Sequence, residues 1–204
     1  MTLTRNNNQN SRHCQIGTLN RLISEELMRA SEHSMVPTKK HQRREAPFVR
    51  GIVSRLAQEG YYVESEVPVR SRTNQTKGRV DLALNRRKTF VEVSLGVGEK
   101  TQTFNPSQNT PEFAKLCNLD GTRVLCLAHW LRDPRYLLPI ESLRERYIKC
   151  LAELPATGTG LVTVVYATPF GWSQFKISLN KRHVLPAINQ HPKTLCLPAP
   201  ARKH

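Results

Sequence analysis

The chain has 204 residues, of which 31 are Lys or Arg and 16 are Asp or Glu, so its formal net charge is +15, and 38% of its residues are hydrophobic. This length fits one domain of ordinary size, and the charge favours a polyanionic partner, above all nucleic acid. No apolar run approaches the length of a membrane span and no secretory signal is visible, so we expect no membrane partner. Five well-separated cysteines without a Cys-x-x-Cys pair argue against a zinc knuckle or a disulfide scaffold. We therefore expect a soluble intracellular protein, cytoplasmic or, in a eukaryote, nuclear.

Residues 1–44 are expected to form a basic, largely disordered arm. Apolar residues at helical spacing predict a short amphipathic helix over about 18–31, either docked on the main domain or used for self-association in a homodimer. The basic linker that follows is typical of segments that contact phosphates or serve as a nuclear address, and a solvated tether is the alternative. Its cations expected to bind nucleic acid are Lys39, Lys40, Arg43 and Arg44.

Residues 45–180 are expected to form the core domain. Pro47 in a first helical turn and an apolar stripe that stops at Gly60 predict a helix over 46–59. A strand over 61–69 comes next, and two further strands lie between Gly78 and Leu95. The turns that flank these strands are basic and supply further cations expected to bind nucleic acid: Arg70, Arg72, Lys77, Arg86, Arg87 and Lys88.

The second half of the core domain alternates between the two element types. The pattern predicts a helix over 111–119 and, over 122–130, an apolar strand covered on both faces. A helix over 139–154 and two strands over 160–167 and 172–179, joined by a hairpin-like turn, complete the domain. A basic, Pro-containing tail over 181–204 follows. The order of elements predicts an α/β fold, with a central mixed sheet flanked by helices.

Two acids, Asp81 and Glu92, each interrupt an apolar strand. Side-chain alternation places Asp81 on the face opposite Val80 and Leu82, and allows the two acids to converge from neighbouring strands. An acid within an apolar strand is costly unless it is paired, binds a metal or faces water. The two acids therefore predict a cation site. In the alternative interpretation, each acid is neutralised by a basic residue of its own hairpin.

The order of elements over roughly 45–131 resembles the core of the PD-(D/E)XK nuclease superfamily, which includes restriction enzymes and the archaeal Holliday-junction resolvases. The resemblance implies a restriction-endonuclease-like core. Val80 stands in place of the motif proline, and Ser94 stands in place of the motif lysine. The stretches that carry the resemblance are the helix that begins Phe48-Val-Arg-Gly-Ile-Val, the strand Arg79-Val-Asp81-Leu-Ala-Leu and the strand Phe90-Val-Glu92-Val-Ser94.

The resemblance implies a metal-dependent endonuclease that hydrolyses phosphodiester bonds in nucleic acid, with DNA favoured over RNA. It also implies Mg²⁺ as the cofactor, with Mn²⁺ as the alternative ion. Glu45 is the candidate acid of the first helix, although it can instead complement the helix dipole. Glu64 and Glu66 are fallback acids. The metal ligands that the resemblance implies are Asp81, Glu92, the Val93 backbone carbonyl and Glu45.

Ser94 cannot orient water or offset negative charge as strongly as the motif lysine. In one interpretation a lysine comes from a later segment, as in some members of the superfamily, with Lys115 as first choice and Lys100 as second. In the other, the protein is a catalytically inactive nucleic-acid-binding or assembly protein with the same fold. A third reading is a structural protein that coats nucleic acid as an oligomer. If the first holds, the implied catalytic residues are Asp81, Glu92, Lys115, Lys100 and Glu45.

Overall fold

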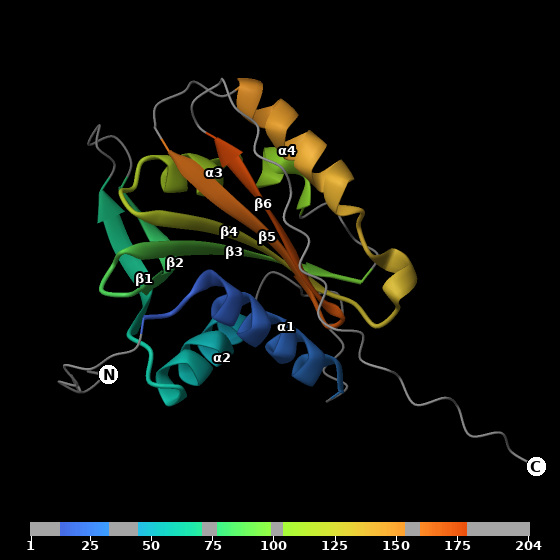
Figure 1. Ribbon diagram of the computed structural model, residues 1–204, viewed down its shortest axis with the longest axis horizontal. Helices are drawn as coiled ribbons and strands as arrows, with labels where there is room; N and C mark the ends of the chain where they lie inside the picture. The colour runs from blue at the N-terminus through green and yellow to red at the C-terminus, as the bar shows by residue number, and fades with distance from the viewer. Residues whose placement is uncertain (1–12, 33–44, 71–76, 99–103, 154–159, 179–204) are drawn as a thin grey trace, which may run out of the picture.

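The computed structural model describes residues 13–32, 45–70, 77–98, 104–153 and 160–178 (Figure 1). These residues form a six-stranded mixed sheet flanked by helices, which confirms the predicted α/β class. Among them, no helix is long and apolar enough to cross a membrane.

The strands lie in the sheet in the same order as in the chain, from β1 to β6. The β3–β4 and β4–β5 pairs are parallel, and the other three pairs are antiparallel. The strands are β1 (Val63–Arg70), β2 (Lys77–Leu84), β3 (Thr89–Val97), β4 (Thr122–Trp130), β5 (Leu161–Thr168) and β6 (Gly171–Ser178). The helices are α1 (Ile16–Glu32), α2 (Glu45–Gln58), α3 (Thr110–Cys117) and α4 (Ile140–Glu153), with short 3-10 turns η3 (Pro106–Gln108) and η4 (Pro134–Tyr136).

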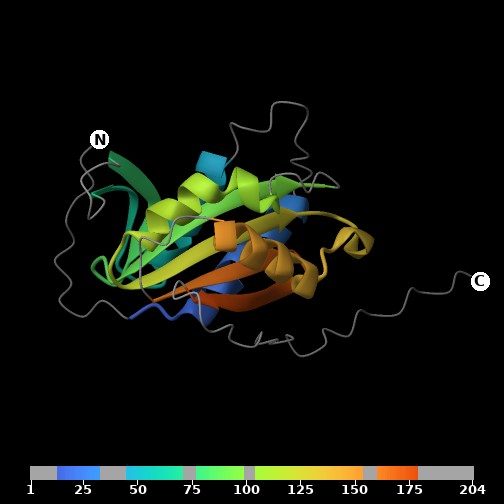
Figure 2. The ribbon, with the colours of Figure 1, turned by 90° about the horizontal axis from the view of Figure 1, so that it is seen from above.

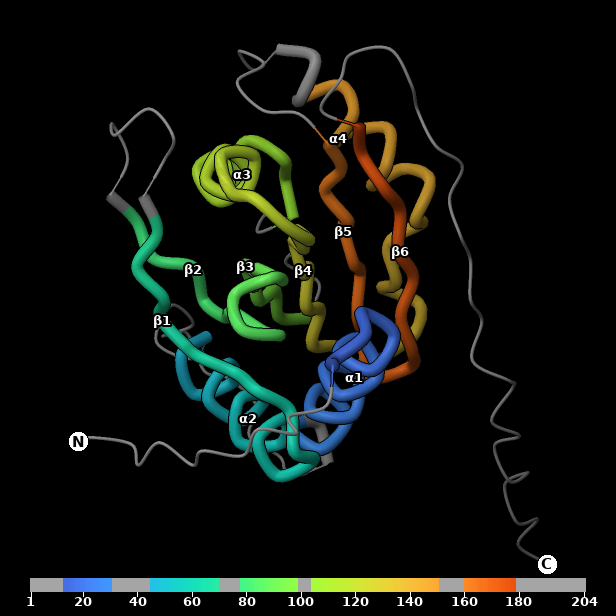
Figure 3. Tube along the Cα trace, turned by 60° about the vertical axis from the view of Figure 1, so that its left-hand side comes forward, coloured from blue at the N-terminus to red at the C-terminus, as the bar shows by residue number. Residues whose placement is uncertain are grey.

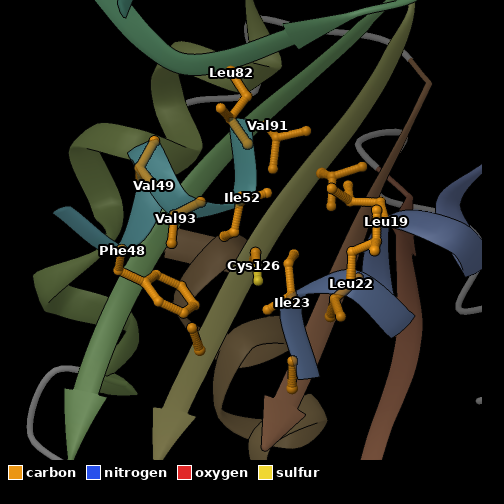
Figure 4. Packing of buried hydrophobic residues seen from close by; sticks show 14 of the residues in the cluster. Leu19, Leu22, Ile23, Phe48, Val49, Ile52, Leu82, Val91, Val93 and Cys126 are labelled. Carbon is orange, nitrogen blue, oxygen red and sulfur yellow. The ribbon is translucent and has the colours of Figure 1, made fainter. Parts of the chain in front are cut away.

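The sheet is the middle of three layers. Helices α1 and α2 cover one face, and α3 and α4 cover the other (Figures 1 and 2). Each face has its own apolar cluster, so the strands are buried on both sides, as expected for the parallel part of a sheet. Figure 4 shows the cluster under the first two helices, with Leu19, Leu22, Ile23, Phe48, Val49 and Ile52 packed on Leu82, Val91, Val93 and Cys126.

Helix α1 is docked on the sheet, which is one of the two placements expected for it. Leu19, Leu22 and Ile23 are fully buried there. The buried Asn20 donates a hydrogen bond from Nδ2 to Oε1 of Gln174 on β6, at 3.2 Å. The first described helix therefore packs against the last described strand.

A buried asparagine fixes the segment that leads into α1. The N–H of Cys14 donates to Oδ1 of Asn85 at 2.7 Å, and Nδ2 of Asn85 donates to the Cys14 carbonyl at 2.9 Å and to Oγ1 of Thr89 at 3.2 Å. Asn85 begins the β2–β3 turn with a φ of 56°, a left-handed conformation that Asn tolerates better than most residues. The turn thus holds the N-terminal segment against the sheet.

His129, on β4, is a packed core residue. Its Nε2 donates to the Gly98 carbonyl at 2.8 Å, so its Nδ1 accepts from the Tyr166 hydroxyl at 2.7 Å. The ring of Phe104 packs edge-on against both rings, and a Cβ at Gly96 would lie 2.3 Å from its Cζ. Burial lowers the pKa of His129, so the imidazole is neutral in this network.

Candidate functional site where two strands part

Strands β2 and β3 pair over only a short length, although β2 begins at Lys77 and β3 continues to Val97. On its other edge, β2 stays paired with β1 from Lys77 to Leu84, with a break in the pairs only at Asp81. Figure 3 shows the outer half of the β1–β2 hairpin turning away from β3 on the side of α3. The described β2–β3 pairs are Leu82↔Val91, Ala83↔Phe90 and Leu84↔Thr89.

The prediction that Val80 shares a face with Leu82 is wrong. Leu82 packs in the cluster under α1 and α2, whereas Val80 packs in the cluster on the α3 and α4 side. The neighbouring strand changes face in the same way, since Val63 packs with the first cluster and Val67 belongs to the second. The physical reason is a break in regular alternation at Glu66, whose φ is 52° instead of an extended value.

Beyond the paired segment, carboxylate side chains replace the β2 backbone as hydrogen-bond acceptors for the edge of β3. The N–H of Val93 donates to Oδ2 of Asp81 at 2.7 Å, and the N–H of Leu95 donates to Oε2 of Glu45 at 3.3 Å. Glu45 is the first residue of α2, so the helix begins one residue earlier than predicted and its first side chain reaches the strand. Because the N–H and C=O of a strand residue point to the same edge, the Val93 carbonyl also faces this gap.

Glu92 and Lys115 complete the group. The carboxyl groups of Glu92 and Asp81 share a hydrogen bond, so the two acids lie on the same side of the sheet. Nζ of Lys115 lies 2.5 Å from Oε1 of Glu92 and donates to the Arg79 carbonyl at 2.6 Å. The stem of Lys115 passes over Gly78, where a Cβ would lie 3.4 Å from Cδ. Lys115 thus crosses from α3 to both parted strands.

The acids of the site hold protons more tightly than ordinary carboxyl groups. Burial, and after it the negative charge of Asp81, raises the pKa of Glu92 to about 8, against the opposing effect of Lys115. Burial also raises the pKa of Asp81, which the Val93 N–H partly offsets. Burial and the Asp81 charge raise the pKa of Glu45. Near neutral pH, Asp81 and Glu92 therefore share a proton instead of carrying two full charges.

The donors of the site suit a hard divalent cation, since they are carboxylate oxygens and one backbone carbonyl. Oε1 of Glu92 is buried and makes no hydrogen bond of good geometry with any described residue, although the Lys115 ammonium is close to it. Across the described ranges, however, no group of three or more acidic, His or Cys side chains is arranged to hold a metal ion. The site therefore fits a divalent ion through two carboxylates and a carbonyl, with Lys115 as the competing cation.

The predicted basic residues are not gathered around the acids. Arg86 and Lys88 are exposed in the β2–β3 turn, at the opposite end of β2 from Lys77, and Arg87 pairs there with Glu64 at 2.7 Å. For Arg70 and Lys77 the structure describes only the backbone. The predicted residues that lie outside the described ranges are Lys39, Lys40, Arg43, Arg44, Arg72 and Lys100.

Two further acids lie near the site. One is Glu66, which the sequence indicates only as a fallback, and its negative charge raises the pKa values of Glu45 and Asp81. The other, Glu112, was missed in the sequence. Glu112 lies three residues before Lys115, has a buried Oε2 without a hydrogen bond to any described residue, and also raises the pKa of Glu45. The i,i+3 spacing of Glu112 and Lys115 on α3 was the available signal, because such residues share a helix face.

Fold and site together define an α/β domain whose mixed sheet opens at a buried pair of acids. Comparison with known proteins found no family model, no curated protein and no solved structure that matches this chain.

Proposed function

We propose that this protein is a metal-dependent endonuclease that hydrolyses phosphodiester bonds in nucleic acid, with DNA favoured over RNA and with Mg²⁺ or Mn²⁺ as its ion. One observation carries the proposal. Asp81 and Glu92 come from neighbouring strands, share a hydrogen bond, and have the ammonium of Lys115 beside them. The net charge of +15 supports a polyanionic substrate.

The residues divide the chemistry among them. A bound divalent ion would polarise the scissile phosphate and acidify an attacking water. Asp81, Glu92 and the Val93 carbonyl would hold this ion through oxygen atoms. Lys115 brings a positive charge to the acids and is the group available to offset charge on phosphate oxygens, in place of a lysine at Ser94. Because its pKa is about 8, Glu92 can gain or lose a proton near neutral pH.

A cleavage assay on labelled duplex, branched and single-stranded substrates, with Mg²⁺ or Mn²⁺, tests the proposal. Asp81→Asn and Glu92→Gln keep the size of each side chain and remove its charge, and we expect both to abolish cleavage. Glu64→Gln is the matched control, because Glu64 pairs with Arg87 away from the acids, and should retain activity. Absence of cleavage with both ions, or cleavage that survives Asp81→Asn, contradicts the proposal.

A second candidate is a non-catalytic nucleic-acid-binding or assembly protein. The observation that favours it is the Lys115 ammonium against Glu92, together with Ser94 at the motif position, because an internal cation already neutralises one acid. This candidate predicts salt-sensitive binding without cleavage. It also predicts that replacing Asp81 and Glu92 by alanine leaves binding unchanged or tighter, since fewer negative charges would then repel phosphate.

A further inference from the structure

We propose that the backbone conformation of Glu66 parts β2 from β3 and thereby positions Asp81 for the site. Glu66 is in this sense a positioning residue, which acts through the strand opposite it. The inference deepens the proposed function and rests on it only for the effect on cleavage, because the arrangement of the two strands can be measured without any substrate.

Glu66 has a conformation that is uncommon in a strand. Its φ of 52° lies in the left-handed region, which side chains other than Gly, Asn and Asp rarely adopt. The pairs on either side, Ser65↔Leu82 and Val67↔Val80, place it directly opposite Asp81 in the β1–β2 register. The irregular residue and the catalytic candidate are therefore at the same level of the hairpin.

The hairpin changes direction at this level. Before it, Val63 and Leu82 face α1 and α2; beyond it, Val67 and Val80 face α3 and α4. A left-handed residue rotates the following peptide plane and so changes the side to which later side chains point. The outer half of the hairpin then lies toward α3, where a Cβ at Gly78 would lie 3.4 Å from Cδ of Lys115.

The end of β2–β3 pairing coincides with this change. The outermost pair is Leu82↔Val91, and Asp81 directly precedes Leu82 in the chain. If β2 continued straight, the same register would bring Val80 opposite Val93, and the N–H of Val93 would be directed at backbone. Instead it donates to the Asp81 carboxylate. The irregular conformation at Glu66 and the open acid site are thus parts of one distortion.

The carboxylate of Glu66 also acts on the site, since its negative charge raises the pKa values of Asp81 and Glu45. The experiment must therefore separate backbone from charge. Glu66→Gly and Glu66→Asn remove the charge and permit the left-handed conformation, whereas Glu66→Val removes the charge and disfavours it. Glu66→Ala disfavours the left-handed conformation less strongly than Glu66→Val, and it replaces the valine variant in the experiment if that variant does not fold.

Arg86→Val is the matched control. Arg86 has a φ of 56° and an exposed side chain, so valine meets the same backbone strain there, but it lies in the β2–β3 turn away from the acids. The measurements are the amide resonances of Val93 and Leu95, and contacts between Val80 and Val93 from nuclear Overhauser effects.

We expect the Gly and Asn variants to keep the amide resonances of Val93 and Leu95 close to those of the parent. The Val or Ala variant should shift both amide resonances, because the carboxylates of Asp81 and Glu45 would no longer accept hydrogen bonds from these N–H groups. Val80–Val93 contacts should also appear in it, and Arg86→Val should change none of these readouts. The inference is overturned if the Val and Ala variants match the parent, or if Gly and Asn disturb the site equally. Each outcome can be read whether or not the protein cleaves nucleic acid.

Discussion

Lys115 and Glu92 form an ion pair across the gap between a helix and a strand, with 2.5 Å between Nζ and Oε1. The Glu92 side chain is only 3% exposed, whereas that of Lys115 is 23% exposed. A carboxylate buried to this degree is costly without a compensating charge. The ammonium therefore stabilises the negative charge that Asp81 and Glu92 share. In the proposed function, it also stands where a phosphate or a metal ion would meet the acids.

Lys115→Ala should lower the cleavage rate at saturating metal by a factor of about 10²–10³, the usual cost of losing one group that stabilises developing charge. Single-turnover cleavage measures this effect, and substrate affinity measured with Ca²⁺ should change much less. Lys149→Ala, which removes an exposed lysine of α4, is the control and should cleave at the parental rate. An equal effect of both variants would mean that Lys115 contributes only general charge.

Glu92→Gln should change how stability depends on pH in the absence of divalent ions. The pKa of Glu92 is about 8 in the folded chain and 4.5 without its environment, so folding favours the protonated form. This contribution is fully present below pH 4.5 and is lost as the pH rises through 8, at about 1.4 kcal/mol for each unit of pKa difference. Urea unfolding at pH 5, 7 and 9 should show a smaller decline in the variant. Parallel declines in the two proteins would contradict the expectation.

Binding of Mn²⁺ should become tighter as the pH rises from 6 to about 8, because the ion requires the ionised forms of Asp81 and Glu92. It should also release protons, which calorimetry in buffers of different ionisation enthalpy detects. Removal of the ion with EDTA should lower the melting temperature to that of the metal-free protein. In Glu92→Gln the dependence on pH should be much weaker, and proton release that persists there would point to other ligands.

Asn85→Ala should destabilise the protein by about 2–4 kcal/mol, since it leaves the buried N–H and carbonyl of Cys14 without partners and adds left-handed strain. Chemical denaturation measures this loss. Arg86→Ala has nearly the same φ but an exposed side chain, so it should cost about 1 kcal/mol or less. Similar losses in both variants would show that strain, and not the hydrogen bonds to Cys14, accounts for the effect.

The helices and strands were predictable because their patterns are local. Every predicted element of the core is present with ends within two residues, and β4 has the predicted bounds, Thr122–Trp130. A continuous apolar run indicates a strand buried on both faces, and apolar residues that recur about every 3.6 positions indicate a helix with one buried face. The face of Val80 was not predictable in this way, because alternation assumes a regular strand and the break lies on a neighbouring strand, at Glu66.

The site was predicted in part. Asp81 and Glu92 stood out as acids in apolar strands, and Lys115 was favoured because a resemblance directed attention to the next helix. The position of Glu45 depended on where α2 begins, and helix ends are the least certain part of a pattern. The separation of β2 from β3 has no sequence signal of its own. It is visible only in the structure, where the carboxylates of Asp81 and Glu45 accept hydrogen bonds from backbone N–H groups of β3.

The hydrogen bond between Asn20 and Gln174 joins residues 154 positions apart, and this separation bears on how the chain matures during synthesis. Strands β1 to β6 can add to the sheet one after another as they leave the ribosome, because each pairs with its predecessor. Helix α1 emerges before all of them, yet its apolar side is closed off by the strands made last. A nascent chain arrested before β5 has α2 and β4 to cover only part of the apolar side of α1. Leu19, Leu22 and Ile23 are then incompletely buried, and at this stage chaperone binding and aggregation should be greatest.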